Sequence, residues 1–292
     1  MGDDPRALLA KADKAFASSS GGFSLFGGRT EKLENAVDLY TQAANAYRLQ
    51  KNGKEAGLLL EKAASIQEEK LNEPDDAALT RSEASKAYRK TDPEDAARCL
   101  DRAIKHYTSR GNFRRAASMQ QTLAEIYEVD IQDGKRAGGA YEAAAGWFEE
   151  DNASALANKL YLKAADIAGL EGDYYKAIEH YERVAKNSIN NDLMRFSVKD
   201  YLLKAGICHL ATNDLVGAGR AVEGYPEMDP SFAGTREHQL LTELLEAVKD
   251  QDTEKYADKL WQFDQMSKLN SWKTTMLLRV KKNIQEEEDD FS

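Results

Sequence analysis

Proline is scarce in this chain of 292 residues: it occurs five times, and never between Pro93 and Pro226. Because proline lacks a backbone N–H and clashes with the preceding turn, its absence there allows long uninterrupted helices. Runs that alternate apolar and polar residues, the pattern of a half-buried strand, are also missing. Leu, Ala, Glu and Lys, which favour helices, dominate instead. The sequence therefore predicts an all-α protein.

Long apolar runs are missing as well. No run reaches the ~20 apolar residues of a membrane-spanning helix, and the first residues lack the apolar core of a secretory signal. Only two cysteines occur, Cys99 and Cys208, and both fall on apolar helix faces. We interpret them as buried, reduced thiols of a cytoplasmic protein.

Positive charge is in deficit. Lys and Arg number 40 against 50 Asp and Glu, which gives a formal net charge of −10. Five of the acids form one run, from Glu286 to Asp290, so the rest of the chain is only mildly acidic. Non-specific nucleic-acid binding needs cations that displace counterions, and we therefore expect no nucleic-acid partner.

Motifs for catalysis are absent too. The four histidines form neither an HExxH motif nor a Cys/His cluster, so no metal site is predicted. The segment 22–30, GFSLFGGRT, has Gly28 where a phosphate-binding loop needs lysine, and no strand precedes it. We expect no cofactor and no enzymatic activity.

A helical hairpin recurs along the chain. In residues 157–185, two segments with apolar residues at helical spacing flank Gly172-Asp173, which suit the end of one helix and the start of the next. Alanines recur at about 40-residue steps, the signature of a helical repeat array: Ala56, Ala96, Ala137, Ala177 and Ala218. The sequence thus predicts hairpins that bury their apolar faces on their neighbours.

The expected helices follow from the same periodicity. A short helix is predicted at 5–17, and ten more at about 31–50, 54–71, 75–90, 93–109, 113–130, 134–150, 155–170, 173–187, 193–211 and 214–223. The pattern breaks at Gly224 to Gly234, and three further helices follow it. We expect two domains: an array over 1–225 with a Gly/Ser-rich loop at 18–29, and a helical bundle with an acidic tail over 226–292.

The Gly/Ser-rich loop carries Phe23, Leu25 and Phe26 at its centre. Glycines on both sides favour an exposed tip that dips into a membrane surface. The alternative is that these side chains fold back onto the first helices. Attachment through such a loop is weak and helps only when another contact holds the protein nearby.

Basic residues form a pattern on the later helices. Lys159 and Lys199 are 40 residues apart and so occupy the same repeat position, while Lys163 and Arg195 each lie one helical turn away from one of them. Arg236 follows. The plain interpretation is a solvated, salt-bridged helix face. The functional interpretation is a positive surface for an acidic, elongated partner.

Several segments resemble one protein family, the soluble NSF attachment proteins of the alpha-SNAP type. The resemblance covers nearly the whole chain and rests on FSLFGG, AANAY, AEIYE, ANKLYLK, KDYLLKAGICH and TTMLLRVKKNIQ, which lie at 23–28, 43–47, 124–128, 157–163, 199–209 and 274–285.

This resemblance implies a tetratricopeptide-like array of antiparallel helical hairpins, wound as a right-handed superhelix, with a C-terminal helical bundle. It also implies an adaptor in vesicle traffic and membrane fusion. Such an adaptor binds the assembled SNARE four-helix bundle and recruits and stimulates the hexameric AAA+ ATPase NSF, while remaining cytoplasmic and peripheral on membranes. The runner-up is a generic tetratricopeptide-like scaffold for another helical or peptide partner.

Site residues carry over by position. The resemblance assigns SNARE binding to Lys159, Lys199 and Arg236, and membrane binding to Phe23 and Phe26. We add Lys163 and Arg195 to the SNARE-binding set from their helical spacing, and Leu25 to the membrane-binding set from its place in the loop. It assigns NSF binding to Asp214, Glu246, Asp250, Asp289, Asp290 and Phe291. Two positions depart from the family: Ser118 stands where a lysine is aligned, and the penultimate Phe291 stands where Leu is usual.

Overall fold

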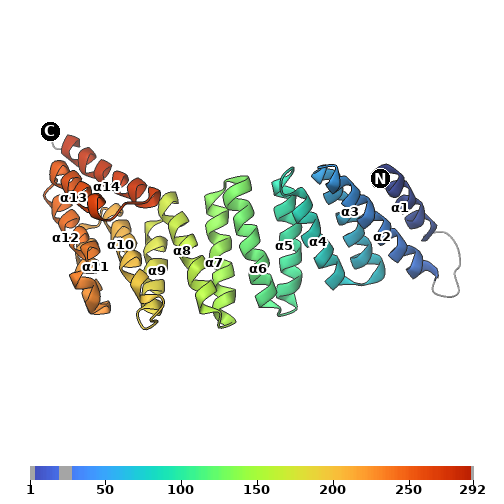
Figure 1. Ribbon diagram of the computed structural model, residues 1–292, viewed down its shortest axis with the longest axis horizontal. Helices are drawn as coiled ribbons and strands as arrows, with labels where there is room; N and C mark the ends of the chain where they lie inside the picture. Colours follow the sequence, from blue (N-terminus) through green and yellow to red (C-terminus); the bar gives the residue numbers. More distant parts are fainter. Residues whose placement is uncertain (1–3, 20–27, 291–292) are drawn as a thin grey trace. The chain divides into compact units, whose positions relative to one another are not determined.

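The computed structural model describes residues 4–19 and 28–290, with side chains described as far as residue 285. Within these residues every regular element is a helix and there is no strand (Figure 1). The predicted all-α fold class is confirmed. No described helix has the length and apolar character needed to cross a membrane.

The chain divides into two compact units, Met1–Ala157 and Asn158–Ser292. Each unit has its own cluster of buried apolar residues. The boundary lies near the start of α8 (Ser154–Glu171). The division expected at 225/226, between an array and a terminal bundle, stays a prediction.

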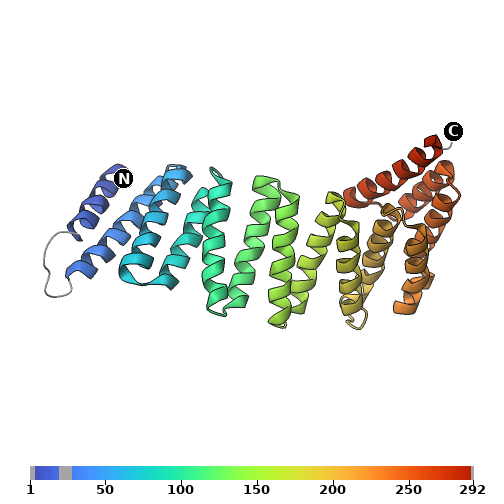
Figure 2. The same ribbon diagram turned by 180° about the vertical axis from the view of Figure 1, so that it is seen from behind.

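Antiparallel helices packed side by side build the first unit (Figures 1 and 2). They are α1 (Pro5–Ser19), α2 (Gly28–Leu49), α3 (Gly53–Ile66), α4 (Pro74–Tyr88), α5 (Pro93–Ser109), α6 (Phe113–Glu125) and α7 (Gly134–Glu150). Short π-helical segments, η1 (Gln67–Leu71) and η2 (Ile126–Ile131), prolong α3 and α6. These bounds match the predicted ones closely, because each helix carries its own apolar period.

Small side chains occupy the helix contacts of this unit. The recurring alanines Ala56, Ala96 and Ala137 are fully buried. Tyrosines then join neighbouring helices through their hydroxyls. Tyr40 donates to Asp13 over 2.6 Å, and Tyr88 donates to Glu61 over 2.8 Å. Each of these two buried tyrosines thus keeps a partner for its hydroxyl, which fixes how the two helices of each pair meet.

The second unit begins in α8 and continues with α9 (Tyr174–Ser188), α10 (Arg195–Ala211), α11 (Leu215–Met228), the 3₁₀ turn η3 (Pro230–Gly234), α12 (Arg236–Lys249), α13 (Thr253–Met266) and α14 (Ser271–Asp290). The predicted turn between the first two is confirmed. Gly172 has a positive φ of 87°, which glycine adopts without strain, and the Asp173 side chain accepts the N–H of Lys176.

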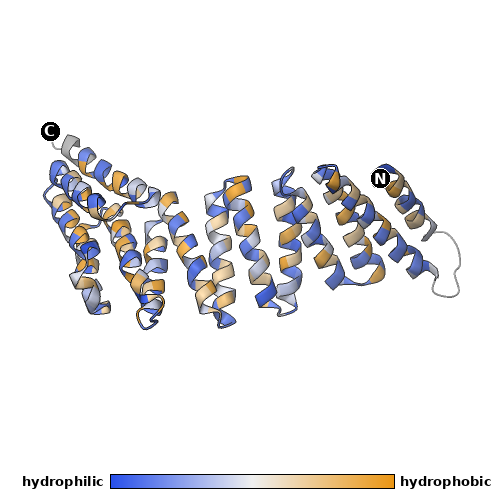
Figure 3. Ribbon diagram, in the orientation of Figure 1, coloured by the Kyte–Doolittle hydropathy of each residue, from blue (hydrophilic) through white to orange (hydrophobic). Residues whose placement is uncertain are grey.

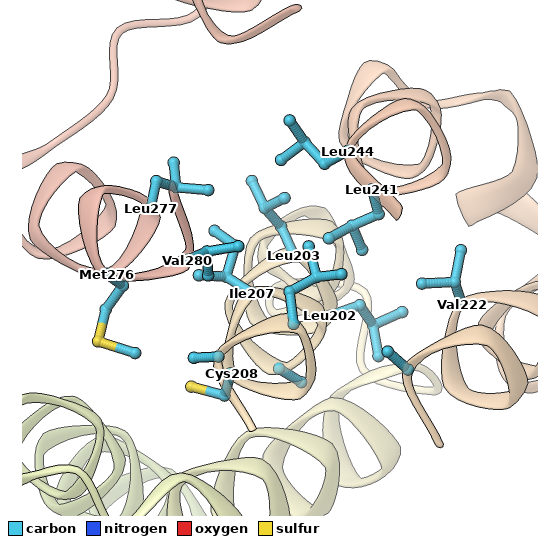
Figure 4. Packing of buried hydrophobic residues seen from close by; sticks show 14 of the residues in the cluster. Leu202, Leu203, Ile207, Cys208, Val222, Leu241, Leu244, Met276, Leu277 and Val280 are labelled. Carbon is cyan, nitrogen blue, oxygen red and sulfur yellow. The ribbon is translucent and has the colours of Figure 1, made fainter. Parts of the chain in front are cut away.

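Helix α10 lies at the centre of the second unit. Its Leu202, Leu203 and Ile207 are fully buried, and Figure 4 shows them surrounded by side chains of α11, α12 and α14. A Cβ on Gly206 would come within 2.6 Å of the Leu241 side chain, so α12 approaches α10 at a position where only glycine fits. Elsewhere each helix carries both apolar and polar residues, as expected for helices with one packed face (Figure 3).

Two helix ends differ from the prediction. Helix α11 continues through Pro226 to Met228 instead of ending near 223. Pro226 lies in the last turn, and the N–H of Asp229 still bonds to the carbonyl of Tyr225 over 2.9 Å, so little of the helix is lost. Helix α14 includes the acidic run as far as Asp290, which we expected to follow the last helix. Glutamate favours helices strongly, which explains the extension.

Candidate functional site

The two cysteines are buried, and one histidine is paired with a carboxylate. Burial raises the pKa of the Cys99 thiol to about 12 and also raises the pKa of Cys208, so neither thiol forms a nucleophilic thiolate. His106 pairs with Asp75 over 2.6 Å. Among the described residues no group of three or more His, Cys, Asp or Glu could hold a metal ion.

The predicted basic residues lie on three helices of the second unit. Lys159 and Lys163 belong to α8, Arg195 and Lys199 to α10, and Arg236 begins α12; all five are exposed. We call these five residues the basic surface. Each of these helices packs an apolar face against the core, so its exposed charged side chains point away from the core.

Helices α8 and α10 are joined side by side by an ion pair. The Nζ of Lys204 lies 2.7 Å from an Asp166 carboxylate oxygen. Lys159 comes seven residues before Asp166, and Lys199 comes five before Lys204. Since both helices run in the same direction (Figure 1), the two lysines lie about 10 and 8 Å before the pair, at nearly the same level.

A second ion pair joins α10 to α12. The Nζ of Lys199 lies 3.0 Å from Glu237 Oε1; the lysine side chain is 50% exposed and the glutamate side chain only 11%. Glu237 follows Arg236 directly, so this pair places the first turn of α12, which contains Arg236, next to α10 at Lys199. The structure thus links the predicted residues of α10 and α12.

Two exposed apolar residues near Arg195 were missed by the sequence analysis. Leu193 is 91% exposed and Phe196 is 80% exposed, and they flank Arg195. A signal was available: Phe196 precedes the buried Val198 by two positions, which is about 200° around a helix and therefore the opposite face. Large exposed apolar side chains this close in the chain are candidates for an interaction site.

Ser118 is an exposed residue of α6 in the first unit. Its hydroxyl donates to the carbonyl of Arg114 over 3.2 Å. The side chain is neutral and satisfied within its own helix, so it adds no positive charge at the position where the family aligns a lysine.

The acidic candidates fall into two groups. Asp214 caps α11 by accepting the N–H of Gly217 over 2.9 Å. Glu246 and Asp250, near the end of α12, lie 3.7 and 3.1 Å from the Nζ of Lys255 and raise its pKa, Asp250 most through a hydrogen bond. The two acids remain mostly exposed and exceed the single lysine in charge.

The remaining predicted residues are only partly covered. The backbone of Asp289 and Asp290 belongs to α14, whereas Phe291 lies outside the described residues. Phe23, Leu25 and Phe26 also lie outside them. The predicted loop 18–29 is too long, because residues 18 and 19 continue α1 and residues 28 and 29 begin α2.

Comparison with known proteins shows which family this chain belongs to. The family model described as soluble NSF attachment protein, SNAP, matches residues 3–285. The chain is 52% identical over 292 residues to a probable vesicular-fusion protein sec17 homolog of Neurospora crassa, with all of both chains covered. It is 40% identical over 286 residues to the human alpha-soluble NSF attachment protein, covering 98% of this chain and 96% of that one.

A relative from Saccharomyces cerevisiae, also an alpha-soluble NSF attachment protein, is 40% identical over 290 residues, with 99% of each chain covered. The similarity to these relatives extends over nearly the whole length of this chain. The chain belongs to the soluble NSF attachment protein family.

Proposed function

We propose that this protein is a non-enzymatic adaptor that binds the assembled SNARE four-helix bundle and recruits and stimulates an NSF-type AAA+ ATPase, which takes the bundle apart after vesicle fusion. The observation that carries the proposal is the basic surface, with exposed Leu193 and Phe196 beside Arg195. Family membership supports the identity of the two partners.

The basic surface suits an acidic partner that is long and rigid. Exposed charges attract over a distance and raise the rate of encounter, but each contributes little affinity alone. Leu193 and Phe196 add apolar area that excludes water once the partner is in place. Several weak contacts on a folded surface then act together, and only a partner that presents matching groups at the same spacing satisfies all of them.

The ATPase contact is assigned to the acidic residues at the C-terminal part of the chain. Glu246 and Asp250 are mostly exposed, and Asp214 is exposed at the start of α11. Asp289 and Asp290 end α14, and Phe291 follows. Acidic residues steer this region toward a basic ATPase surface. A terminal apolar side chain then supplies a contact that long-range attraction cannot.

Membrane attachment is assigned to Phe23, Leu25 and Phe26, which makes the protein peripheral and cytoplasmic. Three apolar side chains between glycines give weak, reversible binding to a membrane surface. Their role is to raise the local concentration of an adaptor that already binds a membrane-anchored SNARE bundle.

A binding assay with assembled and separate SNARE chains tests the proposal. The protein should be retained by the assembled four-helix bundle and not by any single chain, and retention should fall with salt because exposed charges are screened. Added ATPase should then be retained only when the adaptor is present. Retention by single unfolded chains alone would favour a peptide-binding scaffold instead.

A further inference from the structure

Helix α14 is fastened to α8, a helix more than a hundred residues earlier in the chain. Trp272 donates its indole N–H to the carbonyl of Asp166 over 2.8 Å. Arg279 donates from its two terminal nitrogens to the carbonyls of Gly169 and Leu170, over 2.9 and 2.7 Å. All three acceptors lie in the last two turns of α8, which ends at Glu171.

The arginine contact adds donors at the C-terminal end of α8, where the Gly169 carbonyl also accepts the backbone N–H of Gly172 over 3.2 Å. The last four carbonyls of a helix have no donor within the helix and carry partial negative charge. The guanidinium holds its donors in a fixed fork, so it bonds to two adjacent carbonyls at once. A lysine at 279 would keep the charge but lose this two-point geometry.

The tryptophan contact depends on a close approach. A Cβ on Gly169 would come within 2.9 Å of the Trp272 ring, so only glycine admits the ring at that position. The ring also meets Tyr181 edge-on, with 5.7 Å between centroids, and the Lys204 ammonium lies 5.1 Å from its centroid. The indole is therefore held on several sides, and its orientation is fixed.

A third attachment joins α14 to α10, where Lys273 pairs with Asp200. Asp200 directly follows Lys199 of the basic surface. The first half of α14 is thus attached to both helices that carry the lysines of that surface. Its second half ends in Asp289 and Asp290, two of the acidic residues assigned to the ATPase.

We propose that Trp272 and Arg279 are positioning residues that make α8 and α14 one rigid piece, so that force applied by the ATPase at the end of α14 reaches Lys159 and Lys163 on α8. This inference rests on the proposed function. A helix of 20 residues spans about 30 Å and transmits force only if its other end is held. Without the two contacts, α14 would stay attached to α10 through Lys273 and its apolar packing but would lose its hold on the end of α8, and ATP hydrolysis would move α14 relative to α8 instead of moving the bound partner.

Two conservative substitutions isolate the contacts. Trp272→Phe keeps an apolar ring and removes the N–H donor. Arg279→Lys keeps the positive charge and removes the paired guanidinium donors that bond to two carbonyls. The matched controls are Trp261→Phe, at a tryptophan that is 63% exposed, and Arg220→Lys, at an exposed arginine of α11. Neither pair of substitutions alters a residue assigned to a partner.

Three quantities are measured with the full chain, the assembled SNARE bundle and the ATPase: bundle affinity, ATP hydrolysis, and bundles taken apart per ATP hydrolysed. For the double variant, affinity and hydrolysis should change by less than about twofold, because the contacting groups are intact. The number of bundles taken apart per ATP should fall about fivefold or more, since each lost hydrogen bond weakens the attachment of α14 to α8. The control double variant should match the wild type in all three.

An unchanged number of bundles per ATP in the double variant would overturn the inference. So would a loss of bundle affinity parallel to that of disassembly, because it would mean that the contacts merely hold the fold. If the double variant melts early, Arg279→Lys alone is compared with Arg220→Lys by the same criteria. Failure of the wild type to bind the bundle would refute the proposed function, which is a distinct result.

Discussion

Lys199 of α10 and Glu237 of α12 form an ion pair, with 3.0 Å between Nζ and Oε1, in which the glutamate is nearly buried and the lysine is half exposed. Part of the positive charge assigned to partner binding is therefore balanced within the molecule. The pair also holds the lysine side chain in one orientation at the point where α10 and α12 meet.

Replacing Glu237 by Gln should strengthen binding to an acidic bundle at low salt. The substitution removes one negative charge beside Lys199 while keeping the size of the side chain, so attraction to the partner increases. The gain should vanish at high salt, where exposed charges are screened. Binding constants at both salt concentrations measure the effect, with exposed Glu179→Gln as the control. Weaker binding at every salt concentration would mean instead that Glu237 positions the lysine.

Charge removal on the basic surface should abolish bundle binding without unfolding the protein. The variant to test combines Lys159→Glu with Lys199→Gln. Glutamine is used at 199 because a glutamate there would face the nearly buried Glu237 and destabilise the fold. Retention on the assembled bundle and the melting temperature are measured together. As a control, Lys105→Glu with Lys268→Glu changes two exposed lysines elsewhere. Normal retention of the first variant at low salt would exclude the basic surface as the binding site.

The exposed apolar pair should contribute binding that salt does not screen. Leu193→Ser with Phe196→Ser should weaken bundle binding by about 1–2 kcal/mol, the usual loss when an interface anchor is truncated. Stability should stay the same, because both side chains lie in solvent. Val216→Ser, at a residue that is 65% exposed on α11, serves as the control. Equal losses from the control would indicate a general effect of removing surface apolar groups.

The helices could be predicted from the sequence because their signals are local. Apolar residues at helical spacing gave the helix bounds, and the Gly172-Asp173 turn followed from two adjacent residues. The five residues of the basic surface came from their repeat positions and from the family resemblance.

The contacts of α14 with α8 could not be predicted in this way. Trp272 and Asp166 are separated by 106 residues, and Arg279 and Gly169 by 110. Their acceptors are backbone carbonyls, which every residue has, so no residue type marks the partner. The ion pair of Lys199 with Glu237 depends likewise on how α12 returns to α10, which the repeat period does not specify.

The phenylalanines of the N-terminal segment should matter only on membranes. Phe23→Ser with Phe26→Ser should slow the disassembly of membrane-anchored SNARE bundles and leave that of soluble bundles nearly unchanged, because the segment only raises local concentration. Rates on liposomes and in solution are compared, with Leu49→Ser, at a residue that is 83% exposed, as the control. Equal slowing in both assays would show that the phenylalanines pack into the fold.

The terminal apolar residue should matter for the ATPase and not for the bundle. Removing Phe291 and Ser292 should leave bundle binding intact, since the basic surface belongs to α8, α10 and α12. It should reduce ATPase stimulation, because the acidic run from Glu286 to Asp290 raises the encounter rate but gives little specificity. Phe291→Leu should be nearly neutral, since it keeps an apolar side chain of similar volume.

The alanine variant separates the electrostatic attraction of the acidic run from the apolar contact of Phe291. Phe291→Ala keeps every acidic residue and should still lose about 1–2 kcal/mol of ATPase binding, because truncating an anchor removes its buried area. ATP hydrolysis at saturating SNARE bundle is measured for the truncation, the leucine variant and the alanine variant. The order should be wild type and leucine first, alanine next and truncation last. Because salt screens the acidic run but not an apolar contact, the difference between wild type and Phe291→Ala should persist at high salt. Full stimulation by the truncated protein would leave the terminal residue without a role in docking.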